Sequence, residues 1–306
     1  MTNRAEWIAV DWGTSNLRAW GIGADGAVAF TRSSAQGMSK LTPDAYAGAL
    51  SQLLSDAVAA SGAALDVLIC GMAGARQGWM EAPYLDAPAD LGSLADKAVL
   101  PLMPGSRYLP RILPGICQRL AGSEDVMRGE ETQLLGLSTL LPGFAGVVCM
   151  PGTHSKWVEM SGRHVERFAT AMTGELFEVL GTHSVLRHSL GGDRDGPGRD
   201  VGFEAGLAAT IEAPQKLSAM LFKVRAGSLL SGLAPDWSAG FLSGVLIWAE
   251  IGAQRDWIEA GEIPILGDAK LAGLYARGLA MLGAKSRIVD GTAATLAGLK
   301  AARARL

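Results

Sequence analysis

Two short segments of the chain combine residues that could bind a polyphosphate. The segments 11–20 and 151–158 each follow a β-branched apolar run, turn through a glycine and hydroxyl residues, and continue as a second run of strand type. A turn built from small and hydroxyl residues exposes several backbone N–H groups, which can surround a phosphate. Asp11 ends the first apolar run and adds a carboxylate able to bind Mg²⁺. The two segments therefore predict nucleotide-dependent phosphoryl transfer.

Three residues at each turn are the candidate phosphate ligands, mainly through backbone N–H groups. Hydroxyl residues are also common at ordinary turns, and an aspartate at a strand end can simply bond the turn. Two matching turns 140 residues apart (151 − 11) favour phosphate binding, because they imply two similar halves that face one another. A histidine beside such a turn is often a structural donor to backbone. The candidates are Gly13, Thr14 and Ser15 in the first segment, and Gly152, Thr153 and His154 in the second.

The elements that must position these turns repeat along the chain. Each turn lies within a predicted meander of three strands, and a helix and further strands follow each meander. Two copies of a β-β-β-α-β-α plan around a cleft are therefore expected, with domains at 1–144 and 145–306. The predicted meander strands are 7–11, 16–23 and 27–32, and then 147–150, 156–160 and 164–169.

Composition narrows the class of protein. The chain has 306 residues and a net charge of −3, from 27 basic and 30 acidic residues, which does not favour a nucleic-acid partner. The three cysteines are scattered outside metal-ligand spacing and read as free thiols of a reducing compartment. No apolar run approaches the ~20 residues of a membrane span, and no secretory pattern is visible. We expect a cytoplasmic enzyme without a membrane partner.

Glu130 is the strongest candidate for a catalytic acid or base in the sequence. The sequence predicts a helix from Ser123 to about residue 141, and Glu130 would lie on its apolar stripe. A carboxylate there costs free energy unless it is paired or used. It either forms a buried ion pair with Arg128 or Arg18, or serves as the general base that orients an attacking hydroxyl. Glu131 takes that role if the register shifts by one residue.

The ordered set of motifs resembles the 2-dehydro-3-deoxygalactonokinase family, within the superfamily of acetate and sugar kinases, actin and chaperones. The resemblance spans essentially the whole chain. It implies an α/β fold of duplicated actin-like (ribonuclease H-like) domains, each with a mixed sheet and flanking helices, around a central cleft. The motifs that carry it are residues 10–18, 71–74 with 77–79, 127–132, 151–156, 173–177 and 242–244.

The resemblance also implies a reaction. The family transfers the γ-phosphate of ATP, with Mg²⁺, to the 6-hydroxyl of 2-dehydro-3-deoxy-D-galactonate, a step in galactose and galactonate catabolism. Adenosine would bind at Gly267, Asp268 and Gly291, although a strand end before a helix is also an ordinary helix start. The sugar acid, whose carboxylate needs a cationic or N–H-rich clamp, would be contacted by residues from several motifs. These substrate candidates are Arg18, Gly71, Arg76, Gln77, Trp79, Arg128 and Lys156.

Two other functions stay open for the same fold. An exopolyphosphatase-like phosphohydrolase would use Glu130 or Glu131 to activate water. A non-catalytic, nucleotide-gated protein of the actin class would bind ATP without transferring phosphate. The sequence leaves open which 2-keto-3-deoxy sugar acid is preferred and whether the chain forms a homodimer.

Overall fold

The chain forms two compact units. The computed structural model describes residues 4–59, 64–211, 214–258 and 261–306. The first unit comprises Met1–Ala145, Met160–Arg167 and Gly291–Leu306, and the second comprises Gly146–Glu159 and Phe168–Asp290. This division differs from the predicted domains 1–144 and 145–306, because the C-terminal helix and a hairpin tip pack with the first unit. The predicted boundary near residue 145 does mark the place where the chain first leaves that unit.

A five-stranded mixed sheet forms the centre of the first unit. The predicted meander is confirmed: its three strands pair antiparallel, and two further strands add in parallel on the other side. Apolar side chains of these strands enter a core of fully buried residues, including Ile8, Val10 and Ile69. The strand order is β4 (Val28–Ser34), β3 (Leu17–Ile22), β2 (Trp7–Trp12), β6 (Leu65–Gly71) and β9 (Tyr108–Ile112).

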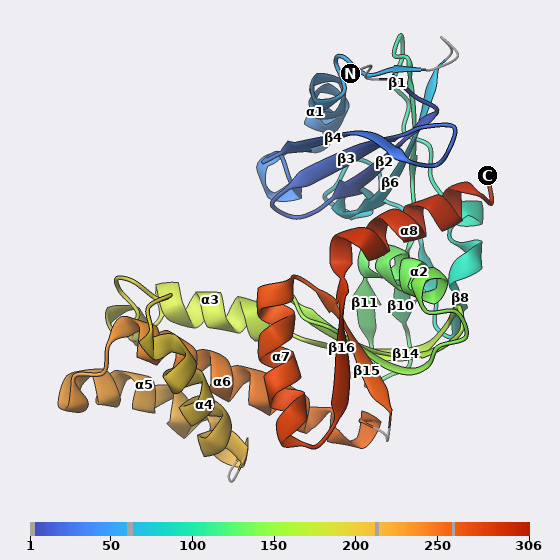
Figure 1. Ribbon diagram of the computed structural model, residues 1–306. Helices are drawn as coiled ribbons and strands as arrows, with labels where there is room; N and C mark the ends of the chain where they lie inside the picture. The colour runs from blue at the N-terminus through green and yellow to red at the C-terminus, as the bar shows by residue number, and fades with distance from the viewer. Residues whose placement is uncertain (1–3, 60–63, 212–213, 259–260) are drawn as a thin grey trace. The chain divides into compact units, whose positions relative to one another are not determined.

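The described part of this unit also contains three α-helices. The helix α1 (Tyr46–Leu53) packs on the sheet, and α8 (Gly291–Arg303) runs beside α2 (Glu130–Leu140), as Figure 1 shows. The two helices approach closely at glycines: a Cβ on Gly136 would lie 1.8 Å from the Ala294 carbonyl oxygen. This contact explains why the last helix belongs to the first unit.

One predicted helix is shorter than expected. The segment from Ser123 was predicted to be helical, but α2 begins only at Glu130 and Asp125–Met127 is the strand β11. Gly129 separates the two with a φ of +106°, a conformation that favours glycine. The apolar stripe on which Glu130 was predicted to lie therefore does not extend to the residues before Glu130.

A small three-stranded sheet precedes α2. In it, β11 pairs with β10 (Gly115–Gln118), which pairs with β7 (Tyr84–Asp86).

The second unit repeats the strand order of the first. Its meander strands are followed in the sheet by two parallel strands, as in the first unit. The hairpin tip formed by residues 160–167 belongs to the first unit, where β14 pairs with β8 (Ala89–Asp90). In the first unit, the two-residue strands β1 (Arg4–Ala5) and β5 (Val58–Ala59) form a separate parallel pair. The repeated order is β14 (His164–Ala171), β13 (Ser155–Ser161), β12 (Ala145–Met150), β15 (Glu262–Gly267) and β16 (Lys285–Asp290).

Helices cover this second sheet. The helix α7 (Ala269–Met281) packs on β15 and β16, whereas the other helices gather beside them (Figure 1). Among these, α4 and α6 approach closely at glycines, since a Cβ on Gly240 would lie 2.0 Å from the Arg199 carbonyl oxygen. These helices are α3 (Thr173–His183), α4 (Gly198–Ile211), α5 (Leu217–Ser231) and α6 (Pro235–Ala253).

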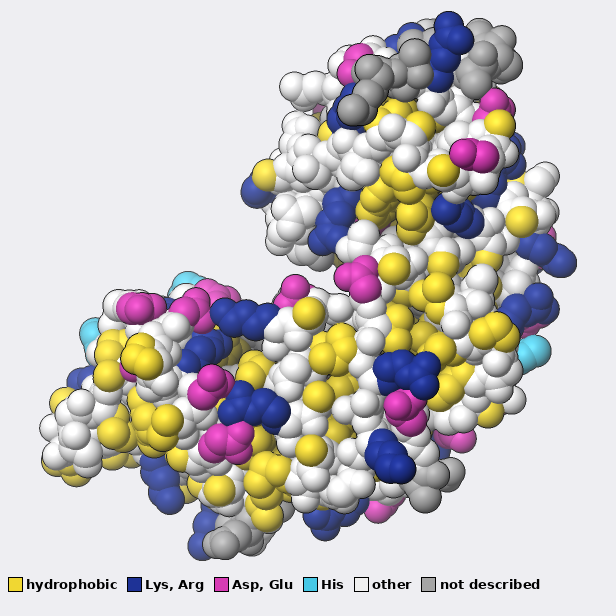
Figure 2. Space-filling view, viewed as in Figure 1, with side chains coloured by type: hydrophobic (Ala, Val, Ile, Leu, Met, Phe, Trp, Pro, Cys, Tyr) yellow, Lys and Arg dark blue, Asp and Glu magenta, His cyan; other side chains and the backbone are white. Residues whose placement is uncertain are grey.

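Acidic and basic side chains are interspersed over the viewed face of the molecule (Figure 2), in keeping with the small net charge of −3. Within the ranges that the structure describes, no helix has the length and apolar character needed to cross a bilayer.

Candidate functional site

The first turn is held in shape by its neighbours. The Gly13 N–H donates to the Asn16 carbonyl at 2.8 Å, and both the N–H and the hydroxyl of Ser39 donate to the Thr14 carbonyl at 2.9 Å. Thr14 and Ser15 are exposed at the tip. Gly37 packs against the turn so tightly that a Cβ would lie 2.3 Å from the Ser15 carbonyl carbon. Gly37 therefore supports the turn, a role that the sequence interpretation missed.

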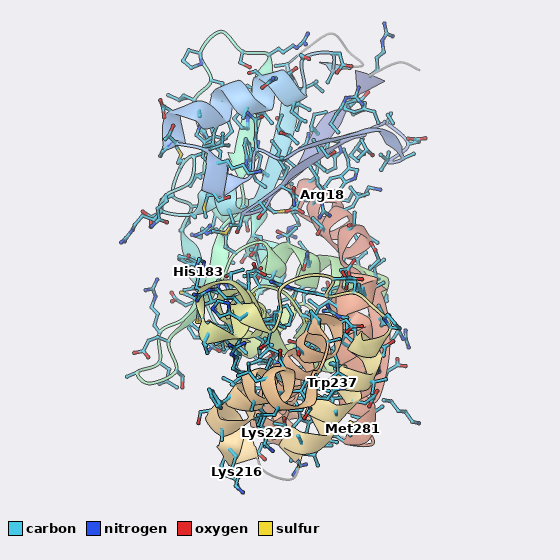
Figure 3. All side chains as sticks on the ribbon, turned by 90° about the vertical axis from the view of Figure 1, so that its left-hand side faces the viewer. Arg18, His183, Lys216, Lys223, Trp237 and Met281 are labelled. Atoms are coloured by element: carbon cyan, nitrogen blue, oxygen red, sulfur yellow. The ribbon has the colours of Figure 1, made fainter. Side chains whose placement is uncertain are left out.

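Asp11 and Arg18 face one another on β2 and β3. Burial raises the pKa of Asp11, the Arg18 charge lowers it, and the Glu130 charge raises it again. Arg18 also donates from Nη1 to the Thr292 hydroxyl at 3.1 Å, and Figure 3 shows it beside the start of α8. The structure thus brings together three of the predicted site residues: Asp11, Arg18 and Glu130.

Two glycines allow α2 to approach Asp11. Gly71 ends β6 with a φ of +89°, and a Cβ there would lie 3.6 Å from Asp11 Oδ1 and 2.6 Å from the Trp12 carbonyl oxygen. A Cβ on Gly129 would lie 3.4 Å from the Gly71 Cα. The N-terminus of α2, which favours negative charge, is therefore next to the end of β6.

Glu130 and Glu131 differ in environment. Glu131 is fully buried, and its carboxylate accepts the Gly129 N–H at 2.5 Å and the Thr132 hydroxyl at 2.9 Å. Burial, with a smaller contribution from the Glu130 charge, raises the pKa of Glu131 from 4.5 to about 7. Glu130 is half-buried and accepts the Arg128 N–H at 3.1 Å. The buried carboxylate is thus Glu131, not the Glu130 that the stripe had predicted.

The Arg128 guanidinium is only partly paired within the described residues. Its guanidinium lies 4.4 Å from the Tyr84 ring centroid, and Nη2 donates to the Ala82 carbonyl at 2.8 Å. Its Nε and Nη1 atoms are buried and have no hydrogen-bond partner among the described residues. Gly74 leaves room for this group, because a Cβ there would lie 2.8 Å from Nη1. Two buried donors without acceptors are costly, unless a ligand supplies the acceptors.

The other predicted sugar contacts occupy two environments. Trp79 joins an aromatic cluster, with its ring 6.1 Å from that of Trp12 and 6.2 Å from that of Tyr46. Arg76 and Gln77 are exposed, and the Arg76 side chain is 80% accessible with an ion pair to Glu81 at 3.6 Å. The structure therefore places Trp79 against the core and leaves Arg76 at the surface.

The second turn contacts the start of α3. The Glu175 N–H donates to the Thr153 carbonyl at 2.9 Å, and a Cβ on Gly174 would lie 2.4 Å from the Gly152 carbonyl oxygen. His154 pairs through Nε2 with the Glu175 carboxylate, and both side chains are exposed. Lys156, which follows Ser155 on β13, is only 4% exposed.

The predicted adenosine residues lie where strands end and helices begin. Asp268 caps α7, because its carboxylate accepts the N–H groups of Lys270 at 2.9 Å and Leu271 at 3.2 Å. Gly267 lies beside the second turn, where a Cβ would be 3.4 Å from the Pro151 carbonyl oxygen. Gly291 begins α8 and belongs to the first unit.

A mainly apolar pocket with a few polar side chains lies within the second unit. It includes Gly152 of the second turn, which ties the pocket to a predicted phosphate ligand. Most of its residues were not predicted as site residues, although Thr173, Gly174, Phe177 and Ser243 belong to motifs that carry the family resemblance. The lining comprises Gly152, Thr173, Gly174, Phe177, Arg199, Ser243, Leu246, Ile247, Leu271, Leu274 and Tyr275.

Comparison with known proteins identifies the family. Residues 11–302 match the family model described as 2-keto-3-deoxy-galactonokinase. The chain belongs to this family. A protein of Rhizobium meliloti (strain 1021), named as a probable 2-dehydro-3-deoxygalactonokinase, is 43% identical over 303 residues, covering 99% of this chain and 98% of the relative. The 2-dehydro-3-deoxygalactonokinase of Escherichia coli (strain K12) is 34% identical over 297 residues, with 97% of each chain covered.

Solved structures confirm the predicted fold class. A crystal structure of a Sinorhizobium meliloti protein that bears the same kinase name has a TM-score of 0.88 at 43% identity, with 97% of each chain covered. Component A of the (R)-2-hydroxyglutaryl-CoA dehydratase of Acidaminococcus fermentans has a TM-score of 0.50 at 10% identity, with 98% of each chain covered. This galactonokinase-family chain thus has an α/β fold of the actin-like class, and it is a sugar kinase.

Proposed function

We propose that the chain transfers the γ-phosphoryl group of ATP to the 6-hydroxyl of 2-dehydro-3-deoxy-D-galactonate. Family membership supports a kinase over a polyphosphate hydrolase or a non-catalytic actin-like protein. The observation that carries the acidic substrate is the Arg128 guanidinium, whose Nε and Nη1 atoms are buried and lack partners in the described part of the chain. A substrate carboxylate would supply the acceptors that these donors lack.

The two turns are proposed to bind the ATP phosphates through backbone N–H groups. Thr14 and Ser15 are exposed at the first turn, and Thr153 is exposed at the second. The pocket beside Gly152 is proposed to receive the adenosine, since it continues from the second turn and is mainly apolar. Gly267 would border this site, whereas Asp268 would act through capping α7.

The donor set near the first turn fits Mg²⁺. No group of three or more His, Cys, Asp or Glu side chains gathers as a metal site within the described residues. Mg²⁺ commonly uses one or two carboxylates together with substrate phosphates and water, so Asp11 is sufficient as its protein ligand. When bound, the ion would neutralise phosphate charge.

Glu130 is proposed as the general base. It is half-buried, at the start of α2, and its charge reaches Asp11. It would accept the proton of the 6-hydroxyl as that oxygen attacks the γ-phosphorus and the bond to the β-phosphate oxygen breaks. Glu131 would orient this segment through its bonds to Gly129 and Thr132. Arg18 would stabilise charge near Asp11, and Trp79 would border the sugar.

A substitution at Arg128 tests the substrate assignment. Arg128→Met should raise KM for the sugar acid roughly 10- to 100-fold, because a charge-assisted contact is lost, while KM for ATP stays unchanged. Arg119→Met is the matched control, since Arg119 is exposed and pairs with Asp86 in the same unit. An unchanged KM for the sugar acid in a folded Arg128→Met protein would remove Arg128 from the site.

We further propose a cytoplasmic location, where ATP and a reducing environment are present. The three cysteines support it, because all are buried free thiols. Size-exclusion chromatography with light scattering would decide whether the chain is a monomer or a homodimer, which the sequence leaves open.

A further inference from the structure

A buried carboxylate lies at the centre of the second unit. Glu250 is 5% exposed, and it is the single charged residue in the otherwise apolar and small segment 237–253 of α6. Burial raises the pKa of Glu250, while hydrogen bonds to its carboxylate lower it. A carboxylate in such a place is costly unless several donors satisfy it. The sequence carried this signal, but Glu250 was not among the predicted site residues.

The donors come from three different elements. Trp157 Nε1, on β13, donates to Oε1 at 2.8 Å, and the Tyr275 hydroxyl, on α7, donates to Oε2 at 2.6 Å. The hydroxyls of Thr173, on α3, and of Ser155 are further polar neighbours that lower the pKa of this carboxylate. Ser155 and Tyr275 are themselves 2.9 Å apart through their hydroxyl oxygens. One carboxylate thus joins β13, α3 and α7.

These donors flank the second turn and its pocket. Ser155 begins β13 immediately after the turn, and Thr173 begins α3, whose Gly174 packs on the Gly152 carbonyl. Thr173 and Tyr275 line the pocket, whereas Glu250 does not. Glu250 therefore bonds to the residues that shape the pocket without lining it.

We propose that Glu250 is a positioning residue for nucleotide binding, which fixes the second turn, the start of α3 and Tyr275 relative to one another. This inference rests on the proposed binding of ATP at that turn. A ligand that contacts backbone N–H groups needs those groups already oriented, because ordering them during binding would lower its affinity. The consequence is specific: the loss of the Glu250 carboxylate should weaken nucleotide binding and spare the sugar-acid site.

Glu250→Gln is the first test, since it keeps the volume but replaces one acceptor oxygen with an NH₂ group. That group would face a donor, either Trp157 Nε1–H or the Tyr275 hydroxyl. We expect the dissociation constant for ADP, measured by titration calorimetry, to rise roughly tenfold. KM for ATP should rise by a similar factor, while KM for the sugar acid stays within about twofold.

Tyr275→Phe provides a second variant, because it removes only the hydroxyl that donates to Glu250 and lies 2.9 Å from the Ser155 hydroxyl. It should weaken ADP binding in the same direction. The double variant should be no weaker than about the poorer single variant, because both changes break the same connection. Tyr275→Phe also keeps the test decisive if Glu250→Gln does not fold.

Met220→Ala is the control for general destabilisation. Met220 is buried on α5 of the same unit and does not line the pocket, so its loss should lower the melting temperature and leave ADP binding unchanged. ADP binding within twofold of wild type in folded Glu250→Gln and Tyr275→Phe would overturn the inference. So would an equal loss of ADP affinity in Met220→Ala. A wild-type protein that does not bind ADP would instead overturn the proposed function on which the inference rests.

Discussion

Asp11 and Arg18 occupy directly opposed positions on antiparallel strands, and the guanidinium opposes the effect of burial on the Asp11 carboxylate. Burial dominates, so the pKa of Asp11 is raised although a cation lies beside it. Arg18 also bonds to Thr292 of α8, which fixes the guanidinium from a second side. The ionisation of the proposed Mg²⁺ ligand therefore depends on Arg18.

Removing this cation should shift the pH dependence of the reaction. Arg18→Gln should raise the pKa of Asp11 further, because only burial and the Glu130 charge remain. The acidic limb of kcat/KM against pH should move to higher pH. Arg32→Gln is the control, since Arg32 lies on the adjacent strand β4 and pairs with Asp56. An acidic limb that stays in place or moves to lower pH would contradict this role for Arg18.

Asp11→Asn tests the metal ligand. A neutral amide is a poorer Mg²⁺ ligand than a carboxylate, so kcat should fall by orders of magnitude. The melting temperature and the affinity for nucleotide should change little, because Asn has nearly the same volume. Asp56→Asn changes an exposed carboxylate of the same unit and should leave kcat unchanged. Near-wild-type turnover by Asp11→Asn at saturating Mg²⁺ would exclude the assignment.

Glu131 predicts a pH dependence of stability. Its pKa is about 7 in the folded protein against 4.5 for the ordinary group, so the folded state binds more protons between these values. The free energy of unfolding should therefore fall as pH rises from about 4.5 to about 7, by about 3 kcal/mol at ~1.4 kcal/mol per pKa unit. Glu131→Gln should flatten this decline in urea titrations at several pH values. An equally steep decline in that variant would show that other groups cause it.

A substitution at Glu130 distinguishes a general base of the kinase reaction from a structural carboxylate. Glu130→Gln keeps volume and hydrogen bonding but removes the base, so kcat should fall strongly with little change in sugar KM or melting temperature. If Glu130 instead completed a buried ion pair, the variant would mainly lose stability, by ~3–5 kcal/mol. Unchanged turnover would transfer the role to Glu131 or another carboxylate. Greater loss of sugar-independent ATP hydrolysis than of sugar phosphorylation would favour the phosphatase alternative.

Local sequence patterns predicted the two meanders because each strand carries its own signal. The strands β2 and β12 are apolar and β-branched, and both lead into turns rich in small residues. The helix expected from Ser123 failed because residue types alone satisfied the stripe, although Gly129 breaks it. A glycine within a helical pattern often marks a break in the helix, but the apolar spacing of the surrounding residues was given more weight.

Long-range packing was beyond such patterns. The placement of α8 with the first unit depends on the close approach of Gly136 to Ala294, two residues far apart in the chain. Two Arg128 nitrogens have no hydrogen-bond partner within the described residues, and this environment likewise follows from the surrounding fold. So do the bonds that Glu250 accepts from β13 and α7. Arg128 was predicted as a carboxylate ligand from its charge and motif. Its environment adds a physical reason that the sequence did not contain.

The most direct test of the proposed function is ADP release by the purified wild-type protein with ATP and Mg²⁺. It should be measured with 2-dehydro-3-deoxy-D-galactonate, with the corresponding gluconate, and without a sugar acid. We predict release that depends on the galactonate, with mass spectrometry showing a 6-phosphate ester as the product. ADP release of equal rate without any sugar acid, or no release with either acid, would contradict the assignment as a sugar-acid kinase.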